Sequence, residues 1–136
     1  TIRVEGRQQK VVVCPCHGWL HIRILNNKLY LHMFQRSGDV PIGVPSNMIQ
    51  YAALTMMLAQ VTGYEVGEYI HTISDAHIYV NQIPTVEEVI KRETFAFPTV
   101  TLTNSTTDFT AFRNSDFTLG DDYKAGEAMR DIPVAI

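Results

Sequence analysis

The chain has 136 residues, of which 46% are hydrophobic and 18% are charged, and its formal net charge is −3. This balance is typical of a single globular domain with a buried core, and it excludes a disordered chain. The small negative charge argues against a broad basic surface for nucleic acid, and the sequence holds no apolar run of membrane-spanning length. We therefore expect neither nucleic acid nor a membrane as a partner.

The two cysteines, Cys14 and Cys16, are separated by one residue. That spacing is too short for an ordinary structural disulfide, so the sequence predicts free thiols in a reducing, cytoplasmic setting. The start of the chain carries no signal-peptide pattern, which agrees with this expectation. Because the chain begins with Thr1 and a mostly polar segment, we expect it to be part of a longer protein.

Two alternating segments predict an antiparallel hairpin. Apolar residues occupy every second position in residues 18–25 and again in residues 29–36, which is typical of half-buried strands. The dipeptide Asn26-Asn27 between them favours a two-residue turn, because asparagine tolerates positive φ. The residues predicted to share one face are Leu20, Ile22 and Ile24 in the first strand and Leu29, Leu31 and Met33 in the second.

A helix is predicted over residues 48–62, because this segment combines helix-favouring residues with apolar positions almost all round. Ser46 or Asn47 is expected to cap its start, and Gly63 is the residue expected just beyond its end. Glycines and prolines between residues 38 and 45 interrupt any regular element and predict a functional loop. A helix that is apolar on every side must be buried, so we expect it at the centre of the domain.

The second half of the chain predicts shorter elements. His77 and Tyr79 share one face if residues 75–81 are extended, and Thr85 is expected to cap a short helix whose two glutamates lie near its positive end. Strands are predicted at residues 10–13, 69–74, 97–102 and within 109–119, the short helix at 84–92, and an irregular tail from residue 120. The predicted class is therefore α+β, a twisted mixed sheet with one central buried helix.

Cys16 is the first candidate for chemistry. A thiolate is a strong nucleophile when a positive charge lies beside it, and His17 or Arg36 could supply that charge. An inert, buried thiol is an equal alternative, because free cysteine is often buried. Cys14 is better explained as a packing residue. A metal site that includes His21 is the weakest alternative, since zinc-binding cysteines are usually spaced by two to four residues, and we predict no metal.

Five further positions could bind an anionic heterocycle. Arg36 and Ser37 offer paired guanidinium donors and a hydroxyl to a phosphate, although they could equally be a solvated strand end. Asn47 is either a helix cap or a group that reads an amide edge, since a carboxamide both donates and accepts. His77 and Tyr79 are either ordinary sheet residues or a pair that binds a hydroxyl.

Several motifs, in this order along the chain, resemble the core of the thymidylate synthase family. They are Cys16-His17, residues 35–40 (QRSGDV), 42–47 (IGVPSN), 51–54 (YAAL), 59–63 (AQVTG), 75–81 (DAHIYVN) and 133–136 (PVAI). The resemblance runs from about Val11 to Ile136 and corresponds to the C-terminal half of a complete enzyme. It implies a single domain over residues 1–136 with that family's fold, a mixed twisted sheet around a central buried helix.

The resemblance also implies a reaction, the reductive methylation of deoxyuridine monophosphate (dUMP) to dTMP. The co-substrate, 5,10-methylenetetrahydrofolate, would supply both the carbon and the hydride. Cys16 matches the nucleophile, whose thiolate adds to carbon 6 of uracil and makes carbon 5 nucleophilic. Arg36 and Asp39 match the other two positions of the implied catalytic group.

The family's binding positions carry over residue by residue. Arg36 and Ser37 match phosphate-binding positions, Asn47 matches the group that reads the uracil amide edge, and His77 with Tyr79 matches the pair on the ribose hydroxyl. The implied substrate contacts are Gln35, Arg36, Ser37, Asp39, Asn47, His77 and Tyr79. The implied folate contacts are Asp39, Gly43 and Ile136, the last within a tail that closes over the ligands and excludes water.

Two alternatives remain open at this point. Related hydroxymethylases use the same thiolate but let water intercept the intermediate; those acting on cytosine nucleotides tend to carry Asp where this chain has Asn47, so the resemblance favours uracil. The other alternative is a nucleotide-binding or dimerisation module without catalysis, because the family forms homodimers through its sheets. The family's general-base glutamate, folate-stacking tryptophans and shared arginines lie upstream of this chain's start. We therefore expect weak or no turnover from the chain alone.

Overall fold

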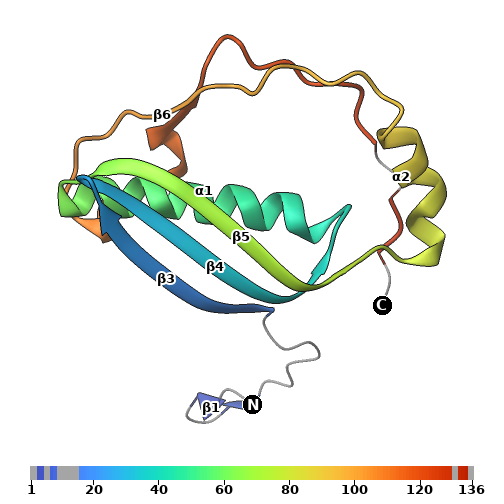
Figure 1. The fold of residues 1–136 in the computed structure, drawn as a ribbon, viewed down its shortest axis with the longest axis horizontal. Coiled ribbons are helices and arrows are strands. Elements are labelled where there is room, and N and C mark those ends of the chain that lie inside the picture. The colour runs from blue at the N-terminus through green and yellow to red at the C-terminus, as the bar shows by residue number, and fades with distance from the viewer. Residues whose placement is uncertain (1–2, 5–6, 9–15, 130–131, 135–136) are drawn as a thin grey trace.

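The computed structural model describes residues 3–4, 7–8, 16–129 and 132–134. A three-stranded sheet carries one long helix on a face, and two extended segments form an arch beyond it (Figure 1). The elements in chain order are β1 (Arg3–Val4), β2 (Arg7–Gln8), β3 (His17–Leu25), β4 (Lys28–Asp39), α1 (Gly43–Thr62), β5 (Glu65–His77), η1 (Val80–Gln82), α2 (Ile83–Val89), β6 (Val100–Leu102), η2 (Phe109–Ala111), η3 (Asn114–Asp116) and β7 (Phe117–Leu119). The predicted α+β class is confirmed.

The strands β3 and β4 form the predicted antiparallel hairpin. Leu25 pairs with Lys28 across the turn, and Asn26 and Asn27 have φ angles of 49° and 61°. Positive φ at both central residues is typical of the turn whose twist matches the right-handed twist of the flanking strands. Asparagine adopts this backbone more readily than most residues, so the local sequence itself favours this hairpin.

The strand β5 lies parallel to β4, and α1 is the crossover between them, so the sheet is mixed with the order β3-β4-β5. Parallel neighbours need such a crossover, because the chain must return to the same end of the sheet before it can pair. The register sets Ser37 opposite Asp75 and Asp39 opposite His77. Residues almost forty positions apart therefore meet where β4 and β5 end.

The core lies between β4 and α1. Leu29, Leu31 and Met33, which alternate along β4, are buried together with Ala59 of α1. Burying a leucine or methionine side chain stabilises a fold by about 1.5–3 kcal/mol, so this face fixes the position of the helix on the sheet. The partly buried side chains packed against this cluster are Tyr51, Leu54, Leu58 and Tyr69.

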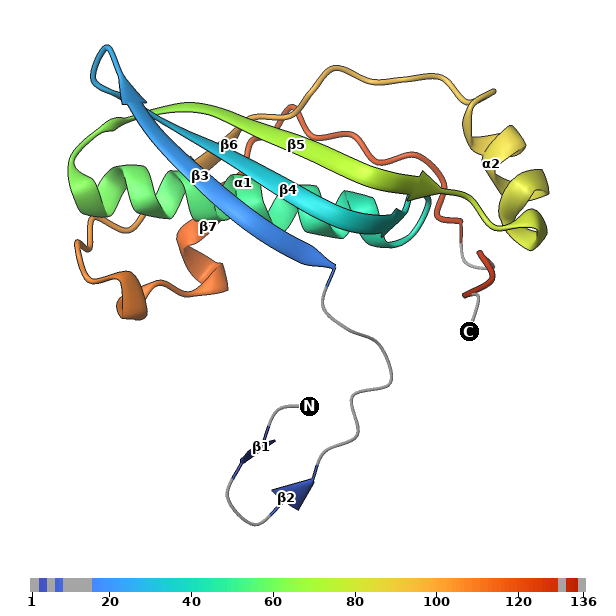
Figure 2. The same ribbon diagram turned by 60° about the horizontal axis from the view of Figure 1, so that its bottom comes forward.

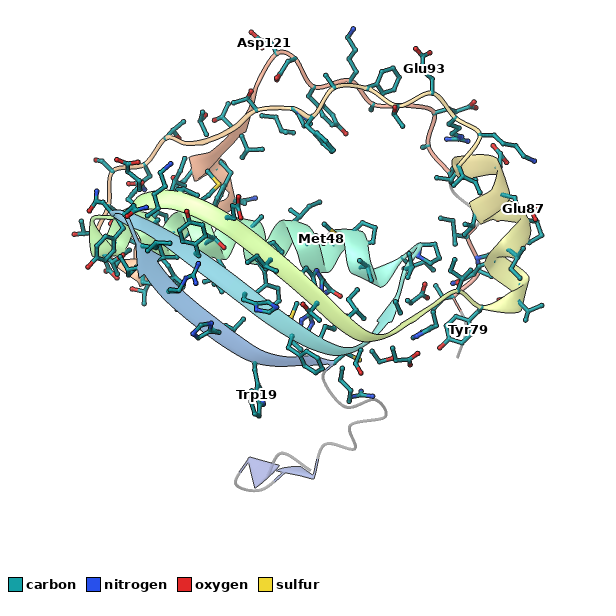
Figure 3. The ribbon with its side chains drawn as sticks, viewed as in Figure 1. Trp19, Met48, Tyr79, Glu87, Glu93 and Asp121 are labelled. Carbon is teal, nitrogen blue, oxygen red and sulfur yellow. The ribbon has the colours of Figure 1, made fainter. Side chains whose placement is uncertain are left out.

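The burial predicted for β3 is not observed. Leu20, Ile22 and Ile24 are 46%, 46% and 41% exposed, although their register partners on β4 belong to the core. The reason is that α1 packs against β4 and β5, beyond which β3 forms the edge of the sheet. On its other face Trp19 points away from the sheet (Figure 3). Alternation predicted the face correctly but could not predict what covers it.

The start of α1 also differs from the prediction. The helix begins at Gly43 with Ile42 as its N-cap, and no side chain caps it, so the expected caps Ser46 and Asn47 lie inside its first turns. Pro45 permits this because a proline in the first turn loses no intrahelical hydrogen bond. The predicted loop at residues 38–45 shortens accordingly, with β4 continuing to residue 39.

The end of α1 is as predicted, with Gly63 in the left-handed conformation at φ 76°. Its burial is less complete than expected: Val44, Thr55 and Ala59 are buried, whereas Ile49 is 71% exposed. The helix is central but buries one face. Within the described residues, no helix is both long and apolar enough to cross a membrane.

Beyond β5 the chain leaves the sheet through η1 and α2, and two extended segments then run side by side (Figures 1 and 2). Arg92 joins them by donating to the backbone carbonyl of Glu127 at 2.5 Å, and the backbone N–H of Thr99 donates to Asp122 at 3.1 Å. The short strands β6 and β7 pair at the far end. Irregular backbone here agrees with the predicted tail.

Several predicted boundaries in this half are corrected. The extended segment 75–81 ends at His77, and η1 follows. The helix α2 has Gln82 as N-cap, with Pro84 in its first turn, so Thr85 is not the cap and the glutamates lie beyond the first turn. The predicted strands 97–102 and 109–119 shrink to three residues each, the latter preceded by η2 and η3. The strand predicted at 10–13 lies outside the described residues.

Candidate active site

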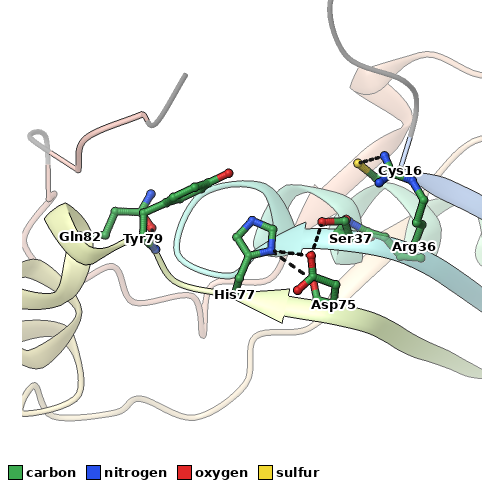
Figure 4. A network of polar contacts seen from close by, with 8 residues as sticks. Cys16, Arg36, Ser37, Asp75, His77, Tyr79 and Gln82 are labelled. Carbon is green, nitrogen blue, oxygen red and sulfur yellow. Dashed lines mark hydrogen bonds and ion pairs between the residues drawn. The ribbon is translucent and has the colours of Figure 1, made fainter.

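The thiol of Cys16 lies beside the guanidinium of Arg36. Cys16 immediately precedes β3, and its backbone carbonyl accepts a hydrogen bond from the backbone N–H of Arg36 at 2.8 Å. The side chains meet too, because Nη2 of Arg36 donates to Sγ of Cys16 at 3.4 Å (Figure 4). A guanidinium in this position can donate a hydrogen bond to a sulfur anion, the nucleophilic form of cysteine. Of the two positive neighbours that the sequence offered, Arg36 is the one that reaches the sulfur.

A row of polar groups follows along the ends of β4 and β5. The hydroxyl of Ser37 donates to Oδ2 of Asp75 at 3.0 Å, and that oxygen lies 3.4 Å from Nδ1 of His77 (Figure 4). The same ring nitrogen lies 3.2 Å from the backbone carbonyl of Asp75, which can only accept. Nδ1 therefore carries the proton, and in the neutral ring Nε2 remains an acceptor. The ring of Tyr79 meets His77 edge-on, with centroids 5.1 Å apart.

Gln35 is a buried residue next to these polar groups, and it contacts three neighbouring residues. Its side chain is 2% exposed, and its Nε2 donates to the backbone carbonyl of Ser37 at 2.8 Å and to Oδ1 of Asn47 at 3.1 Å. Its Oε1 lies 2.9 Å from Nε2 of His71. Both polar atoms of Gln35 are thus engaged within the protein, so this residue orients its neighbours. Asn47 comes from α1 and is half-buried.

Four aromatic rings contact one another in sequence on the α1 side of the sheet. The centroid distances are 5.3 Å from His17 to Tyr51, 6.2 Å from Tyr51 to Tyr69 and 5.7 Å from Tyr69 to His71. Burial, assisted by the nearby phenol of Tyr51, raises the pKa of Tyr69 to about 12. Burial and then the neighbouring His17 lower the pKa of His71. Both effects favour neutral side chains beneath the site.

Asp39 and Gln82 form a second buried junction. Gln82 is fully buried, and its Nε2 donates to Oδ2 of Asp39 at 3.1 Å and to the backbone carbonyl of Pro133 at 2.9 Å. Its Oε1 accepts from the backbone N–H of Tyr79 at 2.9 Å. Oδ1 of Asp39 is buried and has no hydrogen-bond partner within the described part of the chain. A buried carboxylate oxygen in that state fits a donor on a ligand.

Of the remaining predicted positions, Gly43 is described by the structure, whereas Cys14 and Ile136 are not. Gly43 begins α1, and a Cβ added there would come no closer than 3.9 Å, to Oδ1 of Asn47. Cys14, from the weaker metal hypothesis, and Ile136, from the predicted closing tail, lie outside the described residues. Among residues that are described, no group of three or more histidine, cysteine or acidic side chains is placed to hold a metal ion.

Sequence reasoning missed four residues of this region. Asp75 begins the segment 75–81, whose alternation of polar and apolar residues was a usable signal for its face, whereas His71 lies between Ile70 and Thr72 and gave no such signal. Tyr69 was recognised only as the start of a strand. Gln82 gave no signal, because its burial depends on Pro133, which is remote in the sequence.

The fold and the site define an α+β protein that presents a cysteine thiol, a guanidinium and a carboxamide at one end of a mixed sheet. Comparison with known proteins gives the particular family: the thymidylate synthase family model matches residues 4–136. The chain therefore belongs to the thymidylate synthase family. The resemblance read from its motifs is confirmed.

Two relatives agree with this assignment. The chain is 40% identical over 121 residues to a thymidylate synthase of Mycoplasma mobile, in an alignment that covers 89% of this chain and 42% of that protein. Its structure matches the thermostable thymidylate synthase A from Bacillus subtilis with a TM-score of 0.79 and 35% identity, over 87% of this chain and 42% of the other. The chain thus spans about two fifths of the length of the relatives it matches.

Proposed function

We propose that this chain is the C-terminal part of a thymidylate synthase, which methylates dUMP reductively with 5,10-methylenetetrahydrofolate. The observation that carries the proposal is the 3.4 Å hydrogen bond from Arg36 to the thiol of Cys16, in a chain whose family is established. Cys16 is the nucleophile that adds to carbon 6 of the pyrimidine. The electron pair of the ring's 5,6 double bond then makes carbon 5 nucleophilic toward the methylene carbon of the folate.

Arg36 has two tasks in this proposal. Its guanidinium stabilises the thiolate during the addition, and the same group binds the phosphate of the nucleotide, because guanidinium groups bind phosphates through paired hydrogen bonds. Ser37 adds a third donor, although its hydroxyl proton is directed at Asp75 and would have to turn toward the phosphate. Binding of the nucleotide therefore frees one oxygen of Asp75, which stays next to His77.

The base and the sugar are assigned to separate groups. Asn47 donates from its amide nitrogen to a uracil carbonyl and accepts from the ring N–H, a pattern that a carboxamide satisfies in one orientation. His77 and Tyr79 bind the ribose hydroxyl, for which the free Nε2 of His77 is the acceptor. The orientation of Asn47 by Gln35 supports uracil over cytosine.

Asp39 is proposed to contact the folate. Its buried Oδ1, to which no described residue donates, suits an N–H of the pterin ring, and Gln82 holds the other carboxylate oxygen in place. Gly43, at the start of α1, lets the ligand approach the backbone closely because it has no side chain. Ile136 belongs to the segment that closes over both ligands and excludes water from the intermediate.

The proposal includes a homodimer formed through the sheets and a reducing, cytoplasmic setting in which Cys16 remains a thiol. We also expect weak or no turnover by the chain alone, because it covers 42% of the length of each of the two relatives. Binding and adduct formation are therefore the proper tests, with turnover as a further measurement.

The test is an intact-mass measurement after incubation with fluorodeoxyuridine monophosphate and methylenetetrahydrofolate under mild conditions. The expected result is a mass increase equal to nucleotide plus folate that is absent in Cys16→Ala. Cys14→Ala is the matched control and should form the adduct. If nucleotide binds to the chain but no covalent adduct forms in any variant, the chain is a binding module and the catalytic part of the proposal is wrong.

A further inference from the structure

Three side chains form a relay that runs from β5 to α1. His71 contacts Gln35 at 2.9 Å, between its Nε2 and the glutamine Oε1, and Gln35 contacts Asn47 at 3.1 Å. The middle member is nearly inaccessible to solvent, at 2% exposure. His71 is thus linked to Asn47, the candidate residue for recognising the base, through the buried side chain of Gln35.

The direction of the hydrogen bonds in this relay is fixed by a backbone group. The carbonyl of Ser37 can only accept, so the nitrogen of Gln35 must face it, at 2.8 Å. The oxygen of Gln35 then faces His71, whose Nε2 must carry the proton to donate. The lowered pKa of His71, caused by burial and by His17, is consistent with a neutral ring that has a single protonated nitrogen.

The far end of the relay sets the orientation of Asn47. Because Nε2 of Gln35 donates to Oδ1 of Asn47, the carbonyl oxygen of this carboxamide must stay on the side of Gln35. Its second lone pair remains for a ring N–H, and its amide nitrogen remains for a carbonyl, as uracil requires. Cytosine presents an acceptor and an amino donor at these atoms. To pair with it, Asn47 would have to turn its amide nitrogen against the nitrogen of Gln35.

We propose that His71 is a positioning residue for base selection, which holds Gln35 and thereby Asn47 in the orientation that accepts uracil and rejects cytosine. This inference rests on the proposed function and deepens it. The ring of His71 is itself held by Tyr69, 5.7 Å away between centroids, at the end of the row of four rings. Without the histidine N–H, the oxygen of Gln35 is buried without a donor, so the glutamine loses one of the hydrogen bonds that hold its side chain in place.

The first experiment measures nucleotide binding by calorimetry, with dUMP and dCMP as probes. His71→Phe keeps a ring but removes the donor, and His71→Gln restores an N–H at a comparable reach. His32→Phe is the matched control, because His32 lies on β4 and bonds Thr72 on the opposite face of the sheet. Leaving one buried acceptor unpaired corresponds to about a tenfold change in an equilibrium constant. We expect discrimination against dCMP to fall about tenfold in His71→Phe, to recover in His71→Gln and to be unchanged in His32→Phe.

A second measurement separates this inference from the proposed function. The ¹⁵N resonances of His71 in the unmodified chain should show the tautomer protonated at Nε2, and the side-chain amide resonances of Asn47 should shift in His71→Phe but not in His32→Phe. The Nδ1 tautomer, or unshifted Asn47 resonances, would overturn the relay. If the relay is present but neither nucleotide binds, the proposed function fails and with it base selection. Unaltered discrimination in His71→Phe would disprove the positioning role.

Discussion

At the scale of single residues, the environment of Tyr69 has a measurable consequence. Its hydroxyl is buried, finds no hydrogen-bond partner within the described residues, and has its pKa raised to about 12 by burial and by Tyr51. The folded chain therefore favours the neutral phenol more strongly than the unfolded chain does. The phenol belongs to the row of rings that supports His71, so its titration reports on the packing beneath the site.

We predict that Tyr69 makes stability fall at high pH. Below pH 10 the phenol is neutral in both states; between pH 10 and about 12 the unfolded phenol ionises while the folded one does not, so the free energy of unfolding falls. Chemical denaturation of the chain and of Tyr69→Phe across this range should show a loss that is smaller in the variant. Tyr123→Phe, at an exposed position, is the control. Parallel curves for the chain and Tyr69→Phe would contradict the prediction.

Single residues also show what sequence reasoning can recover of the site. Cys16 and Arg36 were each recognised from their chemical types, and the structure brings them together, because the hairpin turn at Asn26-Asn27 sets the register that makes them neighbours. Gln82 was not recognised. Its role depends on contacts with Asp39 and Pro133, which no local pattern encodes.

At the scale of elements, periodicity predicted which strands and which helix exist, but not where they end. The hairpin and the core face of β4 follow from alternation, and Gly63 fixes the end of α1. The helix start was placed too late, because a proline that breaks most helices is tolerated in a first turn. The exposed apolar face of β3 shows a second limit of the prediction. Alternation shows that a strand has an apolar face, but not which element packs against it.

The junction between β4 and α1 gives a prediction about packing. Gly38 is buried, and a Cβ there would lie 2.9 Å from Cγ2 of Val44 and 3.2 Å from Nε2 of Gln35. We expect Gly38→Ala to lower the free energy of unfolding by about 1–3 kcal/mol, as overpacking does, and to disturb Gln35. Urea denaturation measures the change.

Gly43→Ala is the matched control for this substitution, because a Cβ at that position would meet only Oδ1 of Asn47, at 3.9 Å. Its stability should change by no more than about 0.5 kcal/mol. If both alanine variants were equally stable, the close approach at Gly38 would have no energetic consequence, and the glycine would need another explanation.

At the scale of the whole molecule, two glutamine side chains, the buried Gln82 and the partly buried Gln60, tie remote segments to the central layers. Gln82 joins β4, the start of η1 and the segment near the C-terminal end, whereas Gln60 of α1 donates to the backbone carbonyls of Asn104 and Thr106 at 2.7 Å and 2.8 Å. Each side chain supplies hydrogen bonds that its partners' irregular backbone cannot make internally. These amides connect the arch and its ends to the sheet.

We predict that Gln82→Glu releases the segment at residues 132–134. The substitution replaces the donor Nε2 by a carboxylate oxygen that faces the carboxylate of Asp39 and the carbonyl of Pro133. Both acceptors then lack a hydrogen bond, and leaving a buried acceptor unpaired costs about 1–3 kcal/mol. The backbone amides of Ile132 and Val134 should exchange with solvent faster. Gln60→Glu is the control, because it should affect residues 104–106 and leave 132–134 unchanged. Equal exchange at 132–134 in Gln82→Glu and the parent chain would refute the prediction.

The parallel register of β4 and β5 limits how the site can change during evolution. Ser37 faces Asp75 and Asp39 faces His77 because the two strands pair in one frame. A single-residue insertion or deletion inside β5 would turn every side chain beyond it to the opposite face, so the whole polar row would be lost in one event. Insertions and deletions in the family should therefore occur in the arch and the turns. The ends of β4 and β5 should be retained together, because changing the register of one strand separates its polar residues from those of the other.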